Sequence, residues 1–111
     1  MKINGKVFNF LGDSITESVG ASCYQKCFVA LFANAHPDAV VNNYGLGGTR
    51  IAPQRVPSSI PQHDRDFIKR VDEMDERADL VCVFGGTNDY GHGDAPFGQF
   101  GDETLVCLTK K

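Results

Sequence analysis

Three short polar segments that contain glycine carry the residue types needed for acyl-transfer chemistry. Each follows a run of β-forming or apolar residues, and they span residues 12–16, 43–48 and 85–89. Ser14 offers a hydroxyl and a backbone N–H, Gly48 offers an N–H that no side chain shields, and Asn88 offers a side-chain NH₂. Two backbone donors and one amide donor together can stabilise the oxyanion of an acyl-transfer intermediate.

Each segment taken alone is more typical of a turn than of an active site, because glycine, aspartate and asparagine all favour turns. The combination is more informative, since the segments occur in order and each follows a predicted strand. Parallel strands bring their carboxyl ends to one edge of a sheet, where ligands bind. We expect Asp13 to anchor its turn by accepting backbone N–H bonds, and we expect Asp13, Gly45 and Thr87 to line the substrate site.

The strands that must position these segments are predicted from β-forming residues. They span Lys6–Leu11, Ala39–Tyr44 and Leu80–Phe84, and a short final strand is expected at Thr104–Thr109. The run Leu80–Phe84 is apolar throughout, which favours a central parallel strand buried on both faces.

Two helices are predicted between these strands. The first has an apolar stripe and ends at His36–Pro37; its stripe consists of Tyr24, Cys27, Phe28, Leu31, Phe32 and Ala35. The second runs from about Asp64 to Arg77 and buries Phe67, Ile68, Val71 and Met74. Its exposed side is expected to carry the ion pairs Asp66–Arg70 and Glu73–Arg77. Residues 49–63, with three prolines, and residues 90–101 are expected to be loops.

The order strand, helix, strand, loop, helix, strand predicts an α/β fold with a parallel sheet and right-handed crossovers. The 111 residues fit a single domain. A doubly wound sheet uses about five βα units of about 30 residues, and this chain holds only three. We therefore expect a truncated domain whose strand 80–84 has an unpaired edge, which either the tail 104–109 or a second copy of the chain covers.

Composition narrows the class of partner. The 11 basic and 14 acidic residues give a net charge of −3, which argues against binding to nucleic acid. The longest apolar run, Cys27–Ala33, is too short to span a membrane, and the N-terminus does not resemble a signal peptide. Four cysteines without an export signal indicate reduced thiols in the cytoplasm.

No cofactor or metal is expected. Cys23, Cys27, Cys82 and Cys107 could form a tetrathiolate site, but Cys27 and Cys82 belong to apolar elements and fit better as small buried hydrophobic residues. The glycines at 45–48 lack the Lys-Ser/Thr ending of a phosphate-binding loop.

The three segments together resemble the first three sequence blocks of the SGNH (GDSL-type) hydrolases. The resemblance covers roughly Lys6–Asp102, about the first half of a typical member. It implies a flavodoxin-like α/β/α sandwich and a serine ester hydrolase without a cofactor, acting on small acyl esters or acetylated sugars. It also implies that Ser14 is the nucleophile, that the N–H groups of Ser14 and Gly48 are oxyanion donors, and that Asn88 is the side-chain donor.

The family's last block, an Asp-x-x-His that supplies the general base, has no clear counterpart here. The chain ends 22 residues after Asp89, before such a block is expected. Asp89 and His92 have the required spacing, but they overlap the third block, so we expect Asp89 to be a structural carboxylate. His36 and His63 are expected at the surface. The alternative function is a non-catalytic remnant that keeps the crevice and only binds or associates.

Overall fold

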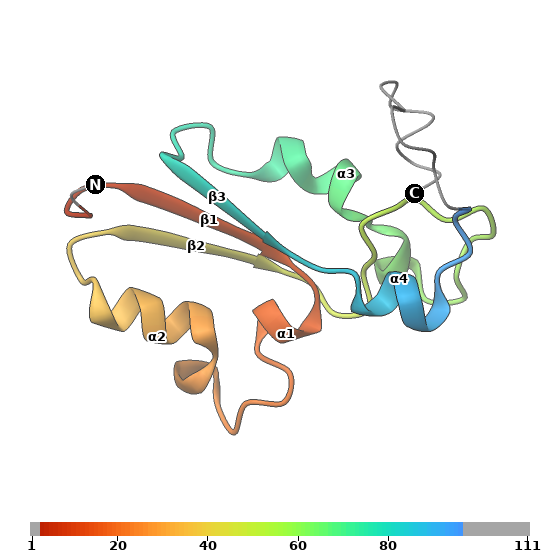
Figure 1. Ribbon diagram of the computed structural model, residues 1–111, viewed down its shortest axis with the longest axis horizontal. Helices are drawn as coiled ribbons and strands as arrows, with labels where there is room; N and C mark the ends of the chain where they lie inside the picture. The colour runs from red at the N-terminus through yellow and green to blue at the C-terminus, as the bar shows by residue number, and fades with distance from the viewer. Residues whose placement is uncertain (1–2, 97–111) are drawn as a thin grey trace.

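A three-stranded parallel sheet forms the framework of the protein, and the computed structural model describes residues 3–96 (Figure 1). Its strands are β1 (Val7–Gly12), β2 (Val40–Gly45) and β3 (Leu80–Phe84), in the spatial order β2-β1-β3. The three predicted strands, their parallel direction and the α/β class are therefore confirmed. The predicted strand 104–109 and the end of the predicted loop 90–101 lie outside the described residues.

The register places the three strand ends level with one another. Gly12, the last residue of β1, is opposite Gly45 of β2 on one side and Phe84 of β3 on the other. The short helices α1 (Ser14–Glu17) and α4 (Thr87–His92) begin within a few residues of these ends. The three polar segments thus emerge at one edge of the sheet, as the sequence predicted.

The two faces of the sheet pack differently because side chains alternate along β1. Phe8 and Phe10 are buried against helix α2 (Phe28–Ala35), where they join Cys27 and Val29 in the core. On the opposite face Asn9 is also buried, and its side-chain amide donates to the carbonyl oxygen of Asp75. Protein therefore covers β1 on both faces, and β1 is the central strand.

The first predicted helix is shorter than the apolar stripe indicated. The 3₁₀ turn η1 (Tyr24–Lys26) precedes α2, and Cys27 between them has extended backbone angles. This break shifts the face that α2 buries: Val29 is 1% exposed, whereas Leu31, which the stripe placed inside, is 54% exposed. The predicted end at His36 is confirmed.

The second predicted helix, at 64–77, is wrong as a continuous element. The chain forms three short turns instead, η2 (Pro61–Asp64), α3 (Phe67–Arg70) and η3 (Val71–Glu73). Of its predicted buried residues, Phe67 is buried, whereas Val71 is 49% exposed.

The ion pairs predicted for this helix are also wrong. The Asp66 carboxylate accepts a hydrogen bond from the Lys69 N–H and caps α3, a local role for which aspartate is well suited. Arg77 pairs with Asp75 instead of Glu73. Arg70 is buried and does not face water.

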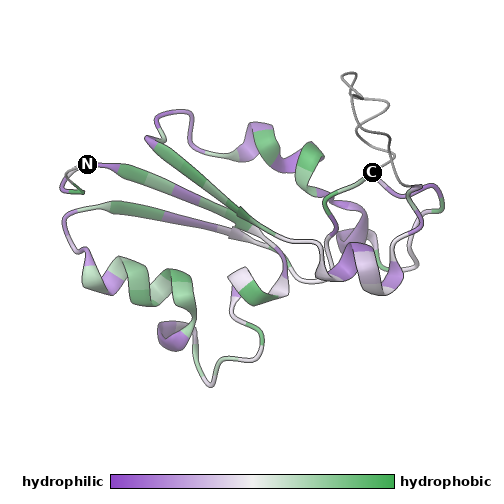
Figure 2. Ribbon diagram, viewed as in Figure 1, coloured by the Kyte–Doolittle hydropathy of each residue, from purple (hydrophilic) through white to green (hydrophobic). Residues whose placement is uncertain are grey.

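Strand β3 lies at the edge of the sheet and not at its centre, which corrects the sequence prediction. It pairs with β1, and no other strand of the described residues pairs with its second edge. Four of its five side chains are exposed, from 45% at Leu80 to 57% at Val83, while Cys82 is half-buried against the core. Figure 2 shows this strand as an apolar ribbon at the border of the sheet. An apolar run therefore marked a strand here, but not its burial.

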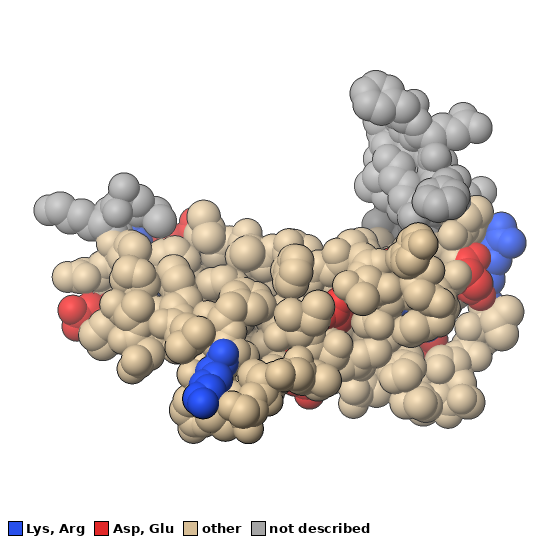
Figure 3. All heavy atoms as spheres, turned by 60° about the horizontal axis from the view of Figure 1, so that its bottom comes forward, with Lys and Arg blue, Asp and Glu red and all other residues tan. Residues whose placement is uncertain are grey.

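The outer surface gives no sign of a strongly charged binding face on the side of α1 and α2. Charged side chains of the described residues are few and scattered there (Figure 3). Within the described range, no helix is long and apolar enough to cross a membrane.

Candidate active site

Ser14 is the first residue of α1, separated from the end of β1 by Asp13 alone, and it is half-buried. Asp13 caps this short helix: its Oδ1 accepts from the Ile15 N–H at 3.0 Å, and its carbonyl accepts from the Glu17 N–H at 3.0 Å. The predicted anchoring role of Asp13 is confirmed. Because Asp13 is only 1% exposed, its carboxylate serves the turn and offers little surface to a substrate.

The second segment passes close to α1. A Cβ on Gly45 would lie 2.2 Å from the Glu17 nitrogen, so only glycine fits this contact. The Gly47 N–H donates to Glu17 Oε2 at 2.6 Å, and a Cβ on Gly47 would lie 3.8 Å from the Ser14 Cβ. Gly45 is thus a packing residue, while Gly47 brings the second segment beside Ser14.

Gly48 has a backbone conformation and a neighbour that both require glycine. Its φ is +76°, and a Cβ there would lie 2.2 Å from the His63 ring. Its N–H donates no hydrogen bond to any residue of the described range. His63, expected at the surface, is instead half-buried and packs against Gly48.

The third segment meets the second through Asn88 and Asp89. Asn88 Nδ2 donates to the carbonyl of Thr49 at 2.9 Å. Because Thr49 follows Gly48 in the sequence, this contact brings the Asn88 amide close to Gly48. The Asp89 carboxylate accepts from the N–H groups of Ile51 and Ala52 at 2.9 and 3.1 Å. The expected structural role of Asp89 is confirmed. Thr87, at the start of α4, is exposed.

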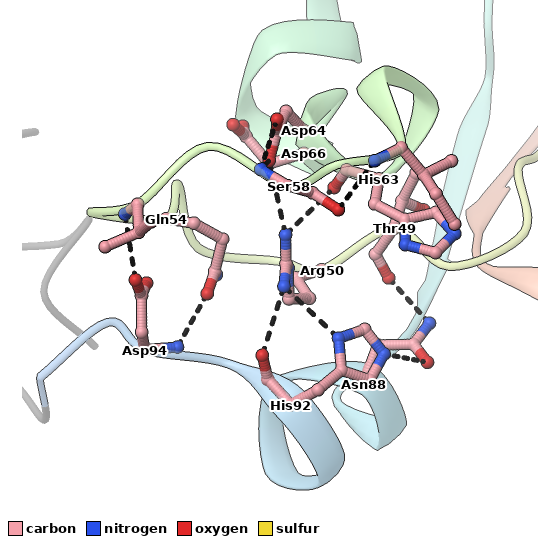
Figure 4. Close-up of polar contacts among 12 residues, drawn as sticks. Thr49, Arg50, Gln54, Ser58, His63, Asp64, Asp66, Asn88, His92 and Asp94 are labelled. Carbon is pink, nitrogen blue, oxygen red and sulfur yellow. Dashed lines mark hydrogen bonds and ion pairs between the residues drawn. The ribbon is translucent and has the colours of Figure 1, made fainter.

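Asp94 continues this attachment further along the same loop. Its carboxylate accepts from the N–H groups of Arg55 and Val56 at 2.8 and 2.9 Å, and its own N–H donates to Gln54 Oε1 at 2.6 Å (Figure 4). These two backbone hydrogen bonds hold the pKa of the Asp94 carboxyl below its ordinary value. The loop after Gly48 is therefore fastened to the segment after Asn88 at several points.

Arg70 of α3 connects the first and second segments through its guanidinium, a role that the sequence did not reveal. Its guanidinium donates to the carbonyls of Gly12 (3.0 Å) and Tyr44 (2.6 Å) and to Thr49 Oγ1 (3.0 Å). Removal from water is the main reason that the pKa of this guanidinium is lowered from its usual value. Nothing in the local sequence distinguished Arg70 from an exposed helical arginine.

Arg50 is a second buried arginine that the sequence analysis missed. It belongs to the loop after β2, is 5% exposed and points toward α4. Figure 4 shows its side chain at the centre of the polar contacts. Its nearest partners are His92, the carbonyl of His63 and the carboxylate of Asp64. Only its position two residues after Gly48 hinted at a role in the site.

The geometry defines an α/β protein with a candidate acyl-transfer site at the carboxyl edge of a parallel sheet. Ser14, Gly48 and Asn88 come from the three strand ends, and contacts between neighbouring residues bring their segments together. Among the described residues, no group of histidine, cysteine, aspartate or glutamate side chains could hold a metal ion.

The chain belongs to the GDSL-like lipase/acylhydrolase family, whose family model matches residues 10–107. It is 31% identical to a protein of known crystal structure from Lactobacillus plantarum, covering 91% of this chain and 43% of that one, with a TM-score of 0.65. No curated protein matches it significantly.

Two more distant structures share the fold. A carbohydrate acetylesterase family member from Sinorhizobium meliloti is 22% identical, with a TM-score of 0.59 over 81% of this chain and 46% of that one. AlinE4, an SGNH-hydrolase family esterase, is 23% identical, with a TM-score of 0.53 over 80% and 44%. This chain thus spans less than half the length of each of these structures.

Proposed function

We propose that this chain carries the nucleophile and the oxyanion donors of a serine ester hydrolase. Membership of the GDSL-like lipase/acylhydrolase family supports a hydrolase of the ester-cleaving type. The observation that carries the proposal is the convergence of Ser14, Gly48 and Asn88 from three level strand ends. Small acyl esters or acetylated sugars are the proposed substrates, and the acetylesterase among the structural neighbours supports this choice.

In the proposed mechanism, Ser14 Oγ attacks the ester carbonyl carbon and forms a tetrahedral intermediate. The N–H groups of Ser14 and Gly48 and the Asn88 amide donate to the oxyanion. A base that takes the Ser14 hydroxyl proton during attack gives it to the departing alkoxide as the intermediate collapses, which expels the alcohol and leaves an acyl-enzyme that water then hydrolyses with the help of the same base. The Gly48 N–H supports this assignment because it donates to no residue of the described range.

The general base is the part of this mechanism that these 111 residues do not obviously supply. A serine hydroxyl is a weak nucleophile without one. The sequence has one Asp-x-x-His, at Asp89–His92. The Asp89 oxygens bind backbone N–H groups, and the two ring nitrogens of His92 face Arg50 and Asn88. This favours His92 as a structural histidine, and it keeps the non-catalytic remnant as the second candidate function.

Added imidazole can act as an external base and so test the proposal on the 111-residue chain. We expect p-nitrophenyl acetate to be hydrolysed faster by imidazole together with the wild-type chain than by imidazole alone. The excess should vanish in Ser14→Ala. His36→Phe, a change at the end of α2 remote from the three strand ends, should leave the excess intact.

Two further measurements sharpen this test. Asn88→Ala should lower kcat of the Ser14-dependent reaction by about 10²–10³ with little change in KM, because an oxyanion donor acts mainly on the transition state. A fluorophosphonate probe should label Ser14 slowly without imidazole. A folded chain with no Ser14-dependent turnover at any imidazole concentration would favour the remnant. Fast labelling that is lost in His92→Ala would make His92 the base.

The remaining expectations stay proposals. The net charge of −3 supports small-molecule substrates over nucleic acid, and the cysteine content supports a cytoplasmic protein.

A further inference from the structure

Asn88 stands at the end of a chain of polar contacts that begins at a buried arginine (Figure 4). Arg50 Nη1 lies 3.2 Å from His92 Nδ1, and His92 Nε2 lies 3.1 Å from Asn88 Oδ1. Asn88 Nδ2 in turn lies 2.9 Å from the Thr49 carbonyl oxygen. The chain thus returns to the residue directly after Gly48.

The protonation of His92 follows from its contact with Arg50. A guanidinium has only donors, so the nitrogen that faces it, His92 Nδ1, must accept. In a neutral imidazole one nitrogen accepts and the other carries the proton. Arg50 therefore places the proton of neutral His92 on Nε2, the atom that faces Asn88.

The Thr49 carbonyl leads to the same answer from the opposite end. A carbonyl oxygen only accepts, so the Asn88 group that faces it must be the NH₂. The Asn88 oxygen then faces His92 Nε2, which must donate to it. The contacts of Arg50 and of the Thr49 carbonyl thus require the same His92 tautomer and the same Asn88 amide orientation. In this arrangement every contact of the series pairs a donor with an acceptor.

Arg50 itself is firmly held. Its Nη1 also donates to the His92 carbonyl at 3.1 Å, and its Nη2 donates to the His63 carbonyl at 3.3 Å and to Asp64 Oδ1 at 3.4 Å. Because Arg50 is 5% exposed, water has little access to compete for these contacts. Arg50 holds the backbone carbonyl of His63, whose ring packs on Gly48, so Arg50 supports two of the three candidate oxyanion donors, Gly48 and Asn88.

We propose that Arg50 and His92 are positioning residues: Arg50 holds His92 as the Nε2–H tautomer, and His92 holds the Asn88 amide in one orientation. That orientation leaves the second Nδ2–H of Asn88 without a partner among the described residues and available to an oxyanion. The role of this second N–H as an oxyanion donor rests on the proposed function. The His92 tautomer and the Asn88 amide orientation do not depend on it.

The first test reads the tautomer directly. Nitrogen-15 spectra of the full chain at about pH 8, where histidine is mostly neutral, should show protonated Nε2 and unprotonated Nδ1 for His92. His36 in the same spectrum is the internal reference. Arg50→Met should increase the Nδ1–H form of His92. An Nδ1–H tautomer in the wild type, or an unchanged tautomer in Arg50→Met, would overturn the proposal.

The second test separates positioning from general packing. His92→Phe keeps an aromatic ring but removes the donor, whereas His92→Gln keeps an N–H near the Nε2 position. We expect His92→Phe to lower kcat of the Ser14-dependent esterase reaction about tenfold, as for one lost hydrogen bond, with KM little changed. His92→Gln should recover most of this loss, and His36→Phe should have no effect.

The two tests fail in different ways. Equal rates for wild type and His92→Phe, or equal losses for both His92 variants, would refute the positioning role. If no variant shows Ser14-dependent turnover, the proposed function fails. The nitrogen spectra, together with the Asn88 NH₂ signals in wild type and His92→Phe, then still decide whether His92 fixes the amide.

Discussion

Replacing Arg70 with methionine should destabilise the protein more than any exposed arginine replacement. The change keeps a long apolar stem but removes the donors to the Gly12, Tyr44 and Arg65 carbonyls and to Thr49 Oγ1. Gly12 and Thr49 each keep another hydrogen bond, to Leu46. The Tyr44 carbonyl also faces the Gly12 N–H in the parallel β1–β2 ladder, and Arg65 is an exposed residue, so the loss is shared among the four hydrogen bonds.

The size of the effect follows from these four hydrogen bonds. Each contributes about 0.5–1.5 kcal/mol net, so losing four costs about 2–6 kcal/mol. Burial of the methionine side chain offsets about 1–2 kcal/mol of this. We expect a net loss of about 2–4 kcal/mol, which corresponds to a fall of about 10–20 °C in Tm for a domain of about 100 residues.

Thermal unfolding followed by circular dichroism measures this loss. Arg77→Met is the matched control, because the same chemical change occurs at a side chain that is 83% exposed, and its Tm should not move measurably. Arg70→Lys keeps the charge and part of the donor set, so its Tm should lie between those of wild type and Arg70→Met. Equal Tm values for Arg70→Met and Arg77→Met would refute the reasoning that Arg70 ties the strand ends together.

Three further outcomes are expected. Gly48→Ala should reduce Ser14-dependent turnover and lower Tm, because the new Cβ needs an unfavourable φ and meets the His63 ring; an unchanged rate and Tm would contradict the close packing. Asp94 has a folded-state pKa below its usual 3.8, so it adds stability above that pH, and this contribution disappears as pH falls through the lowered value. Acid unfolding of Asp94→Asn should therefore depend less on pH below 3.8, and a curve parallel to the wild type would contradict this. The second edge of β3 pairs with no other strand of the described residues, so either the tail 104–109 covers it or light scattering should show a dimer or larger species; a strictly monomeric, folded protein both for the intact chain and for a chain ending at Gly101 would show that the edge needs no such partner.

The strand ends and their polar segments could be predicted because the signals for them are local. β-formers followed abruptly by Gly12, Gly45 and Gly85 mark where each strand stops. The parallel direction then brings the segments together without knowledge of any tertiary contact. The turn-anchoring role of Asp13 is equally local, since its partner Ile15 lies two residues away.

The supporting arginines could not be predicted because their partners are distant in the sequence. Arg70 donates to Gly12, which is 58 residues away, and Arg50 contacts His92, which is 42 residues away. From spacing alone, Arg70 fits an i,i+4 pair with Asp66. In the folded chain Asp66 caps α3, and carbonyls at the strand ends take the guanidinium. The burial of β3 was mispredicted for a related reason. An apolar run shows that a strand can be buried, but it does not show whether another strand or helix covers it.

The neighbouring residues Asn88 and Asp89 have different roles: Asn88 is a candidate oxyanion donor, and Asp89 holds the backbone of the loop after Gly48. This division explains how an irregular loop can form part of an oxyanion site. The loop after Gly48 has no strand or helix until η2, so contacts with other segments hold much of its backbone. Asp89 and Asp94 supply four acceptor contacts to its backbone, and Asn88 binds the Thr49 carbonyl. The donors of the second and third segments are therefore tied together, and we expect a change that loosens Asp89 to displace Gly48 and Asn88 together, even though Asp89 touches neither of the atoms that would face a substrate.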